Sequence, residues 1–186
     1  MNDALKPWGP LAYLAGVWEG DKGDDVAVDD DRGVENNKYR ERITFEPLGP
    51  TMNHEQALHG LRYSTVAHRI GEKDPFHEEL GYWLWDSAHK QVCRCFMIPR
   101  GVTVIAGGSA EATSKVLKMA AEVGSHTYGI CSNSFLDREF KTMKYVLTVT
   151  IHDENSFTYD EDTMIQIKGQ KELFHHTDKN TLKRVK

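Results

Sequence analysis

Hydrophobic and polar side chains alternate with a period of two through most of this chain. In the segment 39–45, Tyr39, Ile43 and Phe45 share one face, and the arginines and the threonine between them take the other. The same alternation runs through 143–151, where five apolar side chains share a face. Because successive side chains of a strand point to opposite faces, this pattern predicts strands that each bury one face.

Turn residues divide the chain into many short strands. We predict a short helical turn at 10–15 and a mobile surface loop in the acidic stretch 21–31. Further strands are predicted at 16–20, 51–61, 63–70, 79–86, 91–99, 101–108, 113–122, 156–160, 163–167 and 172–184. Strands joined by hairpin-length links favour a sandwich or a barrel, and closure removes exposed edges. We therefore expect an all-β fold, an antiparallel closed barrel of about ten strands.

Length, charge and cysteine content narrow the range of possible functions. A chain of 186 residues gives little support for two domains, so we expect one barrel domain over residues 1–186. The net charge is -5 and the densest charge run is acidic, which argues against nucleic acid as a partner. No apolar run approaches the roughly 18 residues that span a membrane, and we see no signal peptide. Three cysteines, an odd number, fit reduced thiols in the cytoplasm.

A barrel of this size can enclose one small ligand, so polar residues on an inner face are the first candidates for a site. Alternation places His77 and Glu79 on one face, together with Gly81. If that face lines a cavity, the two residues form a polar pair in a ligand site. The alternative is a solvated entry to the strand beside Pro75.

A pair of adjacent histidines near the C-terminus is the second candidate. His175 and His176 must point to opposite sides of a strand, so at most one of them faces the barrel interior. An inward neutral imidazole could ligate haem iron, and the alternative is a histidine that is only hydrogen-bonded. Cys93 and Cys95 have the wrong spacing for a zinc knuckle, so we expect them to be core or inner-face thiols.

Three segments, taken together, resemble a known family. The segment 14–20, followed by Gly23, resembles the Gly-x-Trp-x-Gly-x-Gly-x-Gly opening of the nitrobindins. These are haem-binding barrels of the fatty-acid-binding-protein-like, or calycin-like, kind. The segment 77–83 resembles the His-x-Glu-x-Gly-Tyr strand of that family. The C-terminal histidine followed by 182–185 is similar to the closing strand that carries the proximal haem ligand.

The resemblance implies a haem b cofactor and a set of site residues. His176 or His175 would ligate the iron, and His77 would lie near the haem edge or on its distal side. Trp18 and Gly20 would border the pocket, and Glu79 and Tyr82 belong to the matching strand motif, so we include these four among the ligand-binding residues. Nitric oxide binding and isomerisation of peroxynitrite to nitrate are the chemistry that the resemblance implies.

Two departures from the family pattern keep other functions open. The glycine motif has one residue more between Gly20 and Gly23, and the interval from His176 to Val185 is also one residue longer than the family's. A one-residue slip in a strand would send a side chain to the opposite face. The alternative is a haem-free carrier or sensor of a lipophilic molecule such as a fatty acid. A barrel enzyme that uses His77 and Glu79 as an acid–base pair, and a homodimer, are also left open.

Overall fold

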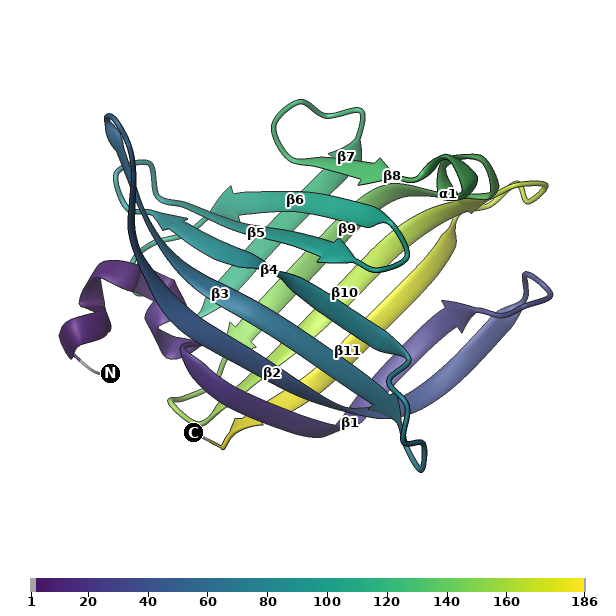
Figure 1. The fold of residues 1–186 in the computed structure, drawn as a ribbon, viewed down its shortest axis with the longest axis horizontal. Helices are drawn as coiled ribbons and strands as arrows, with labels where there is room; N and C mark the ends of the chain where they lie inside the picture. Colours follow the sequence, from purple (N-terminus) through teal and green to yellow (C-terminus); the bar gives the residue numbers. More distant parts are fainter. Residues whose placement is uncertain (1–2, 186) are drawn as a thin grey trace.

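The computed structural model describes residues 3–185, which form a closed β-barrel (Figure 1). Its strands are β1 (Gly16–Val28), β2 (Val34–Asn53), β3 (Gln56–Arg69), β4 (His77–Asp86), β5 (Gln91–Ile98), β6 (Val102–Ser109), β7 (Val116–Val123), β8 (Gly129–Ser132), β9 (Phe140–Ile151), β10 (Ser156–Ile167) and β11 (Phe174–Arg184). Around the barrel their order is β1-β11-β10-β9-β7-β8-β6-β5-β4-β3-β2. A 3-10 helix, η1 (Asp3–Tyr13), precedes the barrel, and a short helix, α1 (Ser134–Glu139), links β8 to β9.

The predicted fold class is confirmed. Among the described residues the barrel has eleven strands, close to the ten expected, and a short helical segment precedes them. Neighbouring strands are antiparallel except β7 and β8, which run parallel over a short stretch. Antiparallel neighbours follow from the hairpin-length links between consecutive strands. Within residues 3–185, no helix has the length and apolar composition needed to cross a bilayer.

The prediction of a mobile loop at 21–31 is wrong for most of that segment. β1 continues to Val28 and pairs with β2 on one side and with β11 on the other. Gly23 and Asp25 are buried on the inner face of β1. The inner face of this strand is therefore polar, and the hydrophobic alternation that marks a half-buried strand is missing from the sequence.

The η1 segment covers one end of the barrel, which is apolar. The indole nitrogen of Trp8 donates hydrogen bonds to the carbonyl oxygens of Leu48 and Gly60, at 3.1 and 2.8 Å. The indole nitrogen of Trp18 donates to the carbonyl oxygen of Leu14 at 2.7 Å. Large buried side chains fill this end, among them Phe45, Leu61, Trp83, Trp85, Phe157 and Leu182. Burial of each stabilises the fold by roughly 1.5–3 kcal/mol, so the closed end supplies much of the core.

The glycine motif of β1 contains one extra residue, which the strand absorbs in a β-bulge. Gly20 pairs with Glu41 and Gly23 with Tyr39, so three steps along β1 match two along β2. A Cβ on Gly23 would overlap the ring of Tyr39, and a Cβ on Gly20 would lie 2.8 Å from the side chain of Asn180. Both glycines therefore make room for polar side chains inside the barrel.

Strand β5 turns its charged residue inward and its cysteines outward. Val92, Arg94 and Phe96 are buried on the inner face, while Cys93 and Cys95 are half-buried on the outer wall. The prediction of core or inner-face thiols is therefore wrong. Arg94 can occupy the inner face because carboxylates inside the barrel pair with its charge.

Candidate functional site

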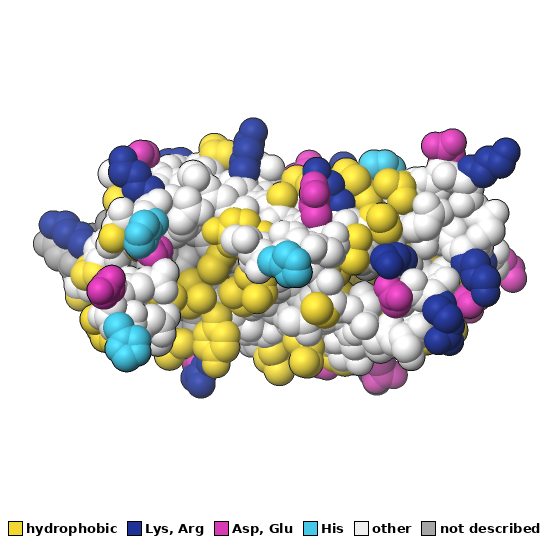
Figure 2. All heavy atoms as spheres, turned by 90° about the horizontal axis from the view of Figure 1, so that it is seen from above, with side chains coloured by type: hydrophobic (Ala, Val, Ile, Leu, Met, Phe, Trp, Pro, Cys, Tyr) yellow, Lys and Arg dark blue, Asp and Glu magenta, His cyan; other side chains and the backbone are white. Residues whose placement is uncertain are grey.

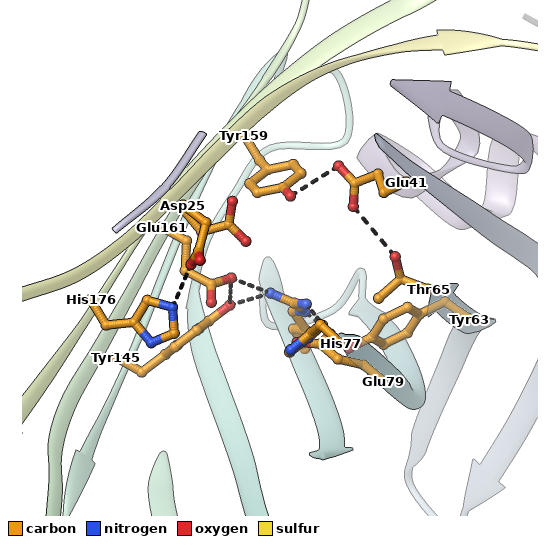
Figure 3. Close-up of polar contacts among 12 residues, drawn as sticks. Asp25, Glu41, Tyr63, Thr65, His77, Glu79, Tyr145, Tyr159, Glu161 and His176 are labelled. Atoms are coloured by element: carbon orange, nitrogen blue, oxygen red, sulfur yellow. Dashed lines mark hydrogen bonds and ion pairs between the residues drawn. The ribbon is translucent and has the colours of Figure 1, made fainter. Parts of the chain in front are cut away.

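A network of polar side chains fills part of the barrel interior (Figure 3). Arg94 is its centre: Nε donates to the hydroxyl of Tyr63 at 3.1 Å, and Nη1 donates to Glu161 at 2.9 Å. The same guanidinium also donates to the Tyr145 hydroxyl and to the Glu79 carboxylate. These five residues come from five different strands, β3, β4, β5, β9 and β10. A buried charge is costly unless it is paired and hydrogen-bonded, so the network favours this one arrangement of the strands.

The structure brings His77 and Glu79 together. Nε2 of His77 lies 3.2 Å from Oε1 of Glu79, while Oε2 accepts hydrogen bonds from Tyr63, at 2.8 Å, and from Arg94. Burial alone would raise the pKa of Glu79, but the charge of Arg94 and the contact with His77 outweigh it and lower that pKa to about 2. Burial would lower the pKa of His77, but Glu79 outweighs it and raises that pKa. Glu79 is therefore an anion near neutral pH, with both oxygens occupied.

A second polar cluster lies beside the first and involves a buried carboxyl of β2. Oε1 of Glu41 accepts hydrogen bonds from the Tyr159 hydroxyl at 2.9 Å and from Nδ2 of Asn180 at 2.8 Å. The hydroxyls of Tyr39 and Tyr159 lie 2.6 Å apart, and Tyr39 donates to Asp178. Burial raises the pKa of Glu41 to about 7, against the opposing effect of these hydrogen bonds. Burial and the nearby charges of Glu161 and Glu41 raise the pKa of Asp178 as well. Both carboxyls of this cluster therefore keep their protons to a higher pH than exposed carboxyls do.

Reasoning from the sequence missed the second cluster. Glu41 stands on the same face as Tyr39 and Ile43, and Asn180 stands on the same face as Leu182. A single polar residue inside an apolar face is the signal that could have found both. Alternation in segment 39–45 already places Glu41 on the face of Tyr39, Ile43 and Phe45.

His176 is the histidine of the pair that faces the interior. Its Nε2 lies 2.8 Å from Oδ1 of Asp25, and its side chain is 35% exposed. Asn37 donates to the other oxygen of Asp25 at 2.9 Å, and Nε of Arg69 donates to Oδ1 of Asn37 at 2.8 Å. Burial would raise the pKa of Asp25, but the hydrogen bond with His176 helps to outweigh it and lower that pKa. A carboxylate therefore orients the imidazole from one side.

The other histidine faces outward. Nδ1 of His175 lies 2.8 Å from Oδ2 of Asp162, and the side chain of His175 is 56% exposed. Phe174 lies two residues before His176 and therefore on the same face of β11. It pairs with Ile165 across the sheet, and both are half-buried. These two side chains give the His176 face an apolar border at the end of the barrel opposite η1, which we call the far end.

The remaining expected site residues are not brought to the far end. Trp18 is buried at the closed end, where its ring centroid lies 4.8 Å from that of Phe157. Gly20 lies between that end and the polar interior. Tyr82 is 46% exposed on the outer wall, because it is one step along the strand from inward-facing Gly81. The expected residues that gather toward the far end are His77, Glu79 and His176 (Figure 3).

Acidic groups dominate the interior polar side chains. The interior carboxyls are those of Asp25, Glu41, Glu79, Glu161 and Asp178. Arg94 is already paired with two of these carboxylates and with two phenols, so it is not available to bind an anionic ligand. The interior is chemically suited to a neutral or cationic group, or to a ligand whose anionic groups stay outside the barrel.

Comparison with known proteins supports the same architecture. A crystal structure described as Rv2717c from M. tuberculosis superposes with a TM-score of 0.68 at 20% identity, covering 100% of this chain and 99% of that chain. At that identity the likeness shows the fold alone. A search of curated proteins gave no match. The family model described as "THAP4-like, heme-binding beta-barrel domain" matches residues 8–184. The chain therefore belongs to the THAP4-like haem-binding β-barrel domain family.

Proposed function

We propose that this protein binds haem b at the far end of its barrel, where His176 would hold the iron. The observation that carries the proposal is the orientation of the histidine pair. His176 faces inward and is held by Asp25, whereas His175 faces outward and is held by Asp162. Membership of a haem-binding barrel family supports haem over other small ligands.

The donor set around His176 fits an iron porphyrin. Nε2 faces Asp25, and among residues 3–185 no hydrogen-bond partner is found for Nδ1. Either imidazole nitrogen can ligate a metal, and a carboxylate on the other nitrogen is the usual arrangement for metal-bound histidine. Phe174 and Ile165, both half-buried beside His176, would offer apolar surface to the bound group. When bound, ferric haem supplies an iron centre that coordinates small ligands such as nitric oxide, the chemistry expected of a nitrobindin-like site.

A haem-free fatty-acid carrier is the weaker candidate. A fatty acid brings a carboxylate that needs a cation or hydroxyl donors inside the barrel. Arg94 is paired with Glu79 and Glu161, and the Tyr63 hydroxyl donates to Glu79. An acid–base role for His77 and Glu79 is weakened in the same way, because both oxygens of Glu79 are engaged. Peroxynitrite isomerisation belongs to the haem proposal and would follow from iron binding.

The location and the domain organisation form part of the same proposal. The cysteines carry free thiols, which supports a reducing compartment and hence the cytoplasm. Residues 1–186 would act as one barrel domain, of which residues 1, 2 and 186 lie outside the described part. Light scattering on the haem-loaded protein would decide between a monomer and a homodimer.

Titration with hemin, followed by absorption spectroscopy, tests the proposal. We expect a Soret band that shifts on binding in the parent protein and in His175→Ala, and a weakened or lost band in His176→Ala. His175 is a matched control, because it is the adjacent histidine on the opposite face of the same strand. Near-UV circular dichroism of each variant would verify folding. A parent protein without a protein-dependent Soret shift, or equal losses in the two variants, would contradict the proposal.

A further inference from the structure

The outer face of β5 carries three sulfur-containing side chains in succession. Cys93, Cys95 and Met97 alternate with buried Val92, Arg94 and Phe96, so all three sulfur side chains point away from the barrel interior. The Sγ atoms of Cys93 and Cys95 lie 3.9 Å apart. Cys93 also lines a shallow outer groove of about 290 Å³. The haem proposal does not use these residues.

The two thiols are held on a central strand of the sheet. β5 pairs with β4 on one side and with β6 on the other. Cys95 lies between Tyr82 and Ile105 in these ladders, and both neighbours are exposed apolar side chains. Hydrogen bonding on both sides keeps the backbone of the two cysteines in place, so the sulfur atoms are arranged before any ligand arrives.

The spacing of the sulfur atoms suits a bound ion better than a disulfide. A disulfide needs an S–S bond of about 2.05 Å, and the ladders on both sides of β5 oppose the backbone movement that would close the gap. Metal–sulfur bonds are about 2.3 Å long, so two thiolates on one ion can lie up to about 4.6 Å apart. The observed 3.9 Å falls within that span.

The chemistry of the donors selects the kind of ion. Thiolate and thioether sulfur prefer soft ions such as Cu(I), while Mg²⁺ and Ca²⁺ require oxygen ligands. Zinc would need four donors, and among the described residues no group of three or more histidine, cysteine or acidic side chains is placed to hold a metal. The nearby carboxylate of Asp86 is already engaged by Gln56 and His89. Figure 2 shows hydrophobic side chains gathered across the middle of the face seen from above. β5 and β6 lie on the side of the barrel nearest that face (Figure 1).

We propose that Cys93 and Cys95 form a two-thiolate site for a soft monovalent metal ion, Cu(I), with Met97 as a neighbouring thioether. Binding replaces the two thiol protons with one Cu(I) ion, and both protons pass to solvent. The site lies on the outer wall, whereas the polar network and His176 lie inside. Metal binding at Cys93 and Cys95 is therefore independent of haem.

Anaerobic competition against the chromogenic Cu(I) chelator bicinchoninate tests the site on the full chain. We expect the parent protein, with its three thiols reduced, to withdraw one equivalent of Cu(I) from the chelator. Cys93→Ser and Cys95→Ser should each weaken binding by about 100-fold or more, since even outer-shell partners of a metal contribute 10–100-fold. Cys131→Ser is the control and should bind like the parent, because Cys131 is the remaining thiol and lies on β8.

Two results would overturn the copper site. In the first, the parent protein does not compete with the chelator for Cu(I). In the second, Cys131→Ser loses as much affinity for Cu(I) as Cys93→Ser and Cys95→Ser. A mass loss of two hydrogen atoms on air oxidation, in which dioxygen takes up the two electrons and two protons, together with no copper binding under reducing conditions, would assign the pair to a disulfide instead. Hemin titration of Cys93→Ser should match the parent, which separates this test from the test of His176.

Discussion

Nε2 of His176 and Oδ1 of Asp25 lie 2.8 Å apart, although the two residues are 151 positions apart in the sequence. The contact joins β11 to β1, the first and last strands of the barrel, which pair with each other at the closure. Asp25 is 3% exposed and is fixed by Asn37, so the carboxylate is a rigid support for the imidazole.

Asp25→Asn should weaken hemin binding by about 10–100-fold, the usual loss when the partner of a metal-bound histidine is removed. The amide keeps the shape of the carboxylate but loses its charge. Asp24→Asn is the matched control, since Asp24 pairs with Lys38 and Lys179 at the surface. Hemin titrations of both variants would measure the difference. Equal affinities for Asp25→Asn and the parent would mean that His176 does not depend on this support.

Glu41→Gln should change how stability depends on pH. The folded protein keeps a proton on Glu41 up to about pH 7, while the unfolded chain loses it near pH 4.5. Stability that comes from this carboxyl is therefore present below about pH 4.5 and is lost as pH rises through about 7, by up to about 3 kcal/mol. The variant should show a shallower decline over that window in urea unfolding experiments. Because the pKa of Asp178 is also raised, the free energy of unfolding of the variant should still fall somewhat as pH rises.

The control for this experiment is Glu46→Gln, because Glu46 is an exposed carboxylate paired with Arg62 on the outer wall. Its pH profile should follow that of the parent. A slope that is unchanged in Glu41→Gln would show that Glu41 is ionised in the folded state.

Arg94→Met should destabilise the barrel by about 3–5 kcal/mol, because it leaves buried Glu79 and partly buried Glu161 without their cation. Adding Glu79→Gln and Glu161→Gln to the same chain should recover much of the loss, since the uncompensated charges are gone. Urea denaturation midpoints would measure both effects, provided that the dependence of the unfolding free energy on urea concentration is unchanged. Arg62→Met, at an exposed pair, should cost less than about 1 kcal/mol, and a similar small effect at Arg94 would contradict the network.

Gly23→Ala should destabilise the protein by about 1–3 kcal/mol, because the new methyl group would overlap the ring of Tyr39. Tyr39→Leu in the same chain should relieve part of this cost. A double-mutant cycle from thermal or urea unfolding would measure the coupling between the two positions. Additive effects would show that the ring is free to move away from Gly23.

The strands could be predicted where their inner faces are apolar, as in 143–151, because burial of one face leaves a period of two in the sequence. The polar interior could not be predicted as well. Arg94 lies on the inner face, against the usual rule that charges face water, so its neighbours Cys93 and Cys95 face outward and not into the barrel as predicted. Glu41 is a second charged residue on an inner face, where the same rule would not place it.

The candidate site could be predicted in part. Adjacent histidines must face opposite sides, and the sequence narrowed the inward one to His175 or His176. Only the register between β10 and β11 decides which of them faces inward. Asp25 lies in the acidic stretch that was predicted to be a loop, and its pairing with His176, far away in the chain, leaves no local pattern in the sequence.

The bulge between Gly20 and Gly23 bears on how this family can vary over evolution. An inserted residue in a regular strand would exchange its inner and outer sides from that point onward. Here two residues of β1 stand opposite one of β2, so Gly23 and Asp25 keep the sides that an uninterrupted Gly-x-Gly spacing would give them. An additional residue in this strand is thus accommodated without exchanging the inner and outer faces, and a search pattern that demands fixed glycine spacing would overlook chains with such a bulge.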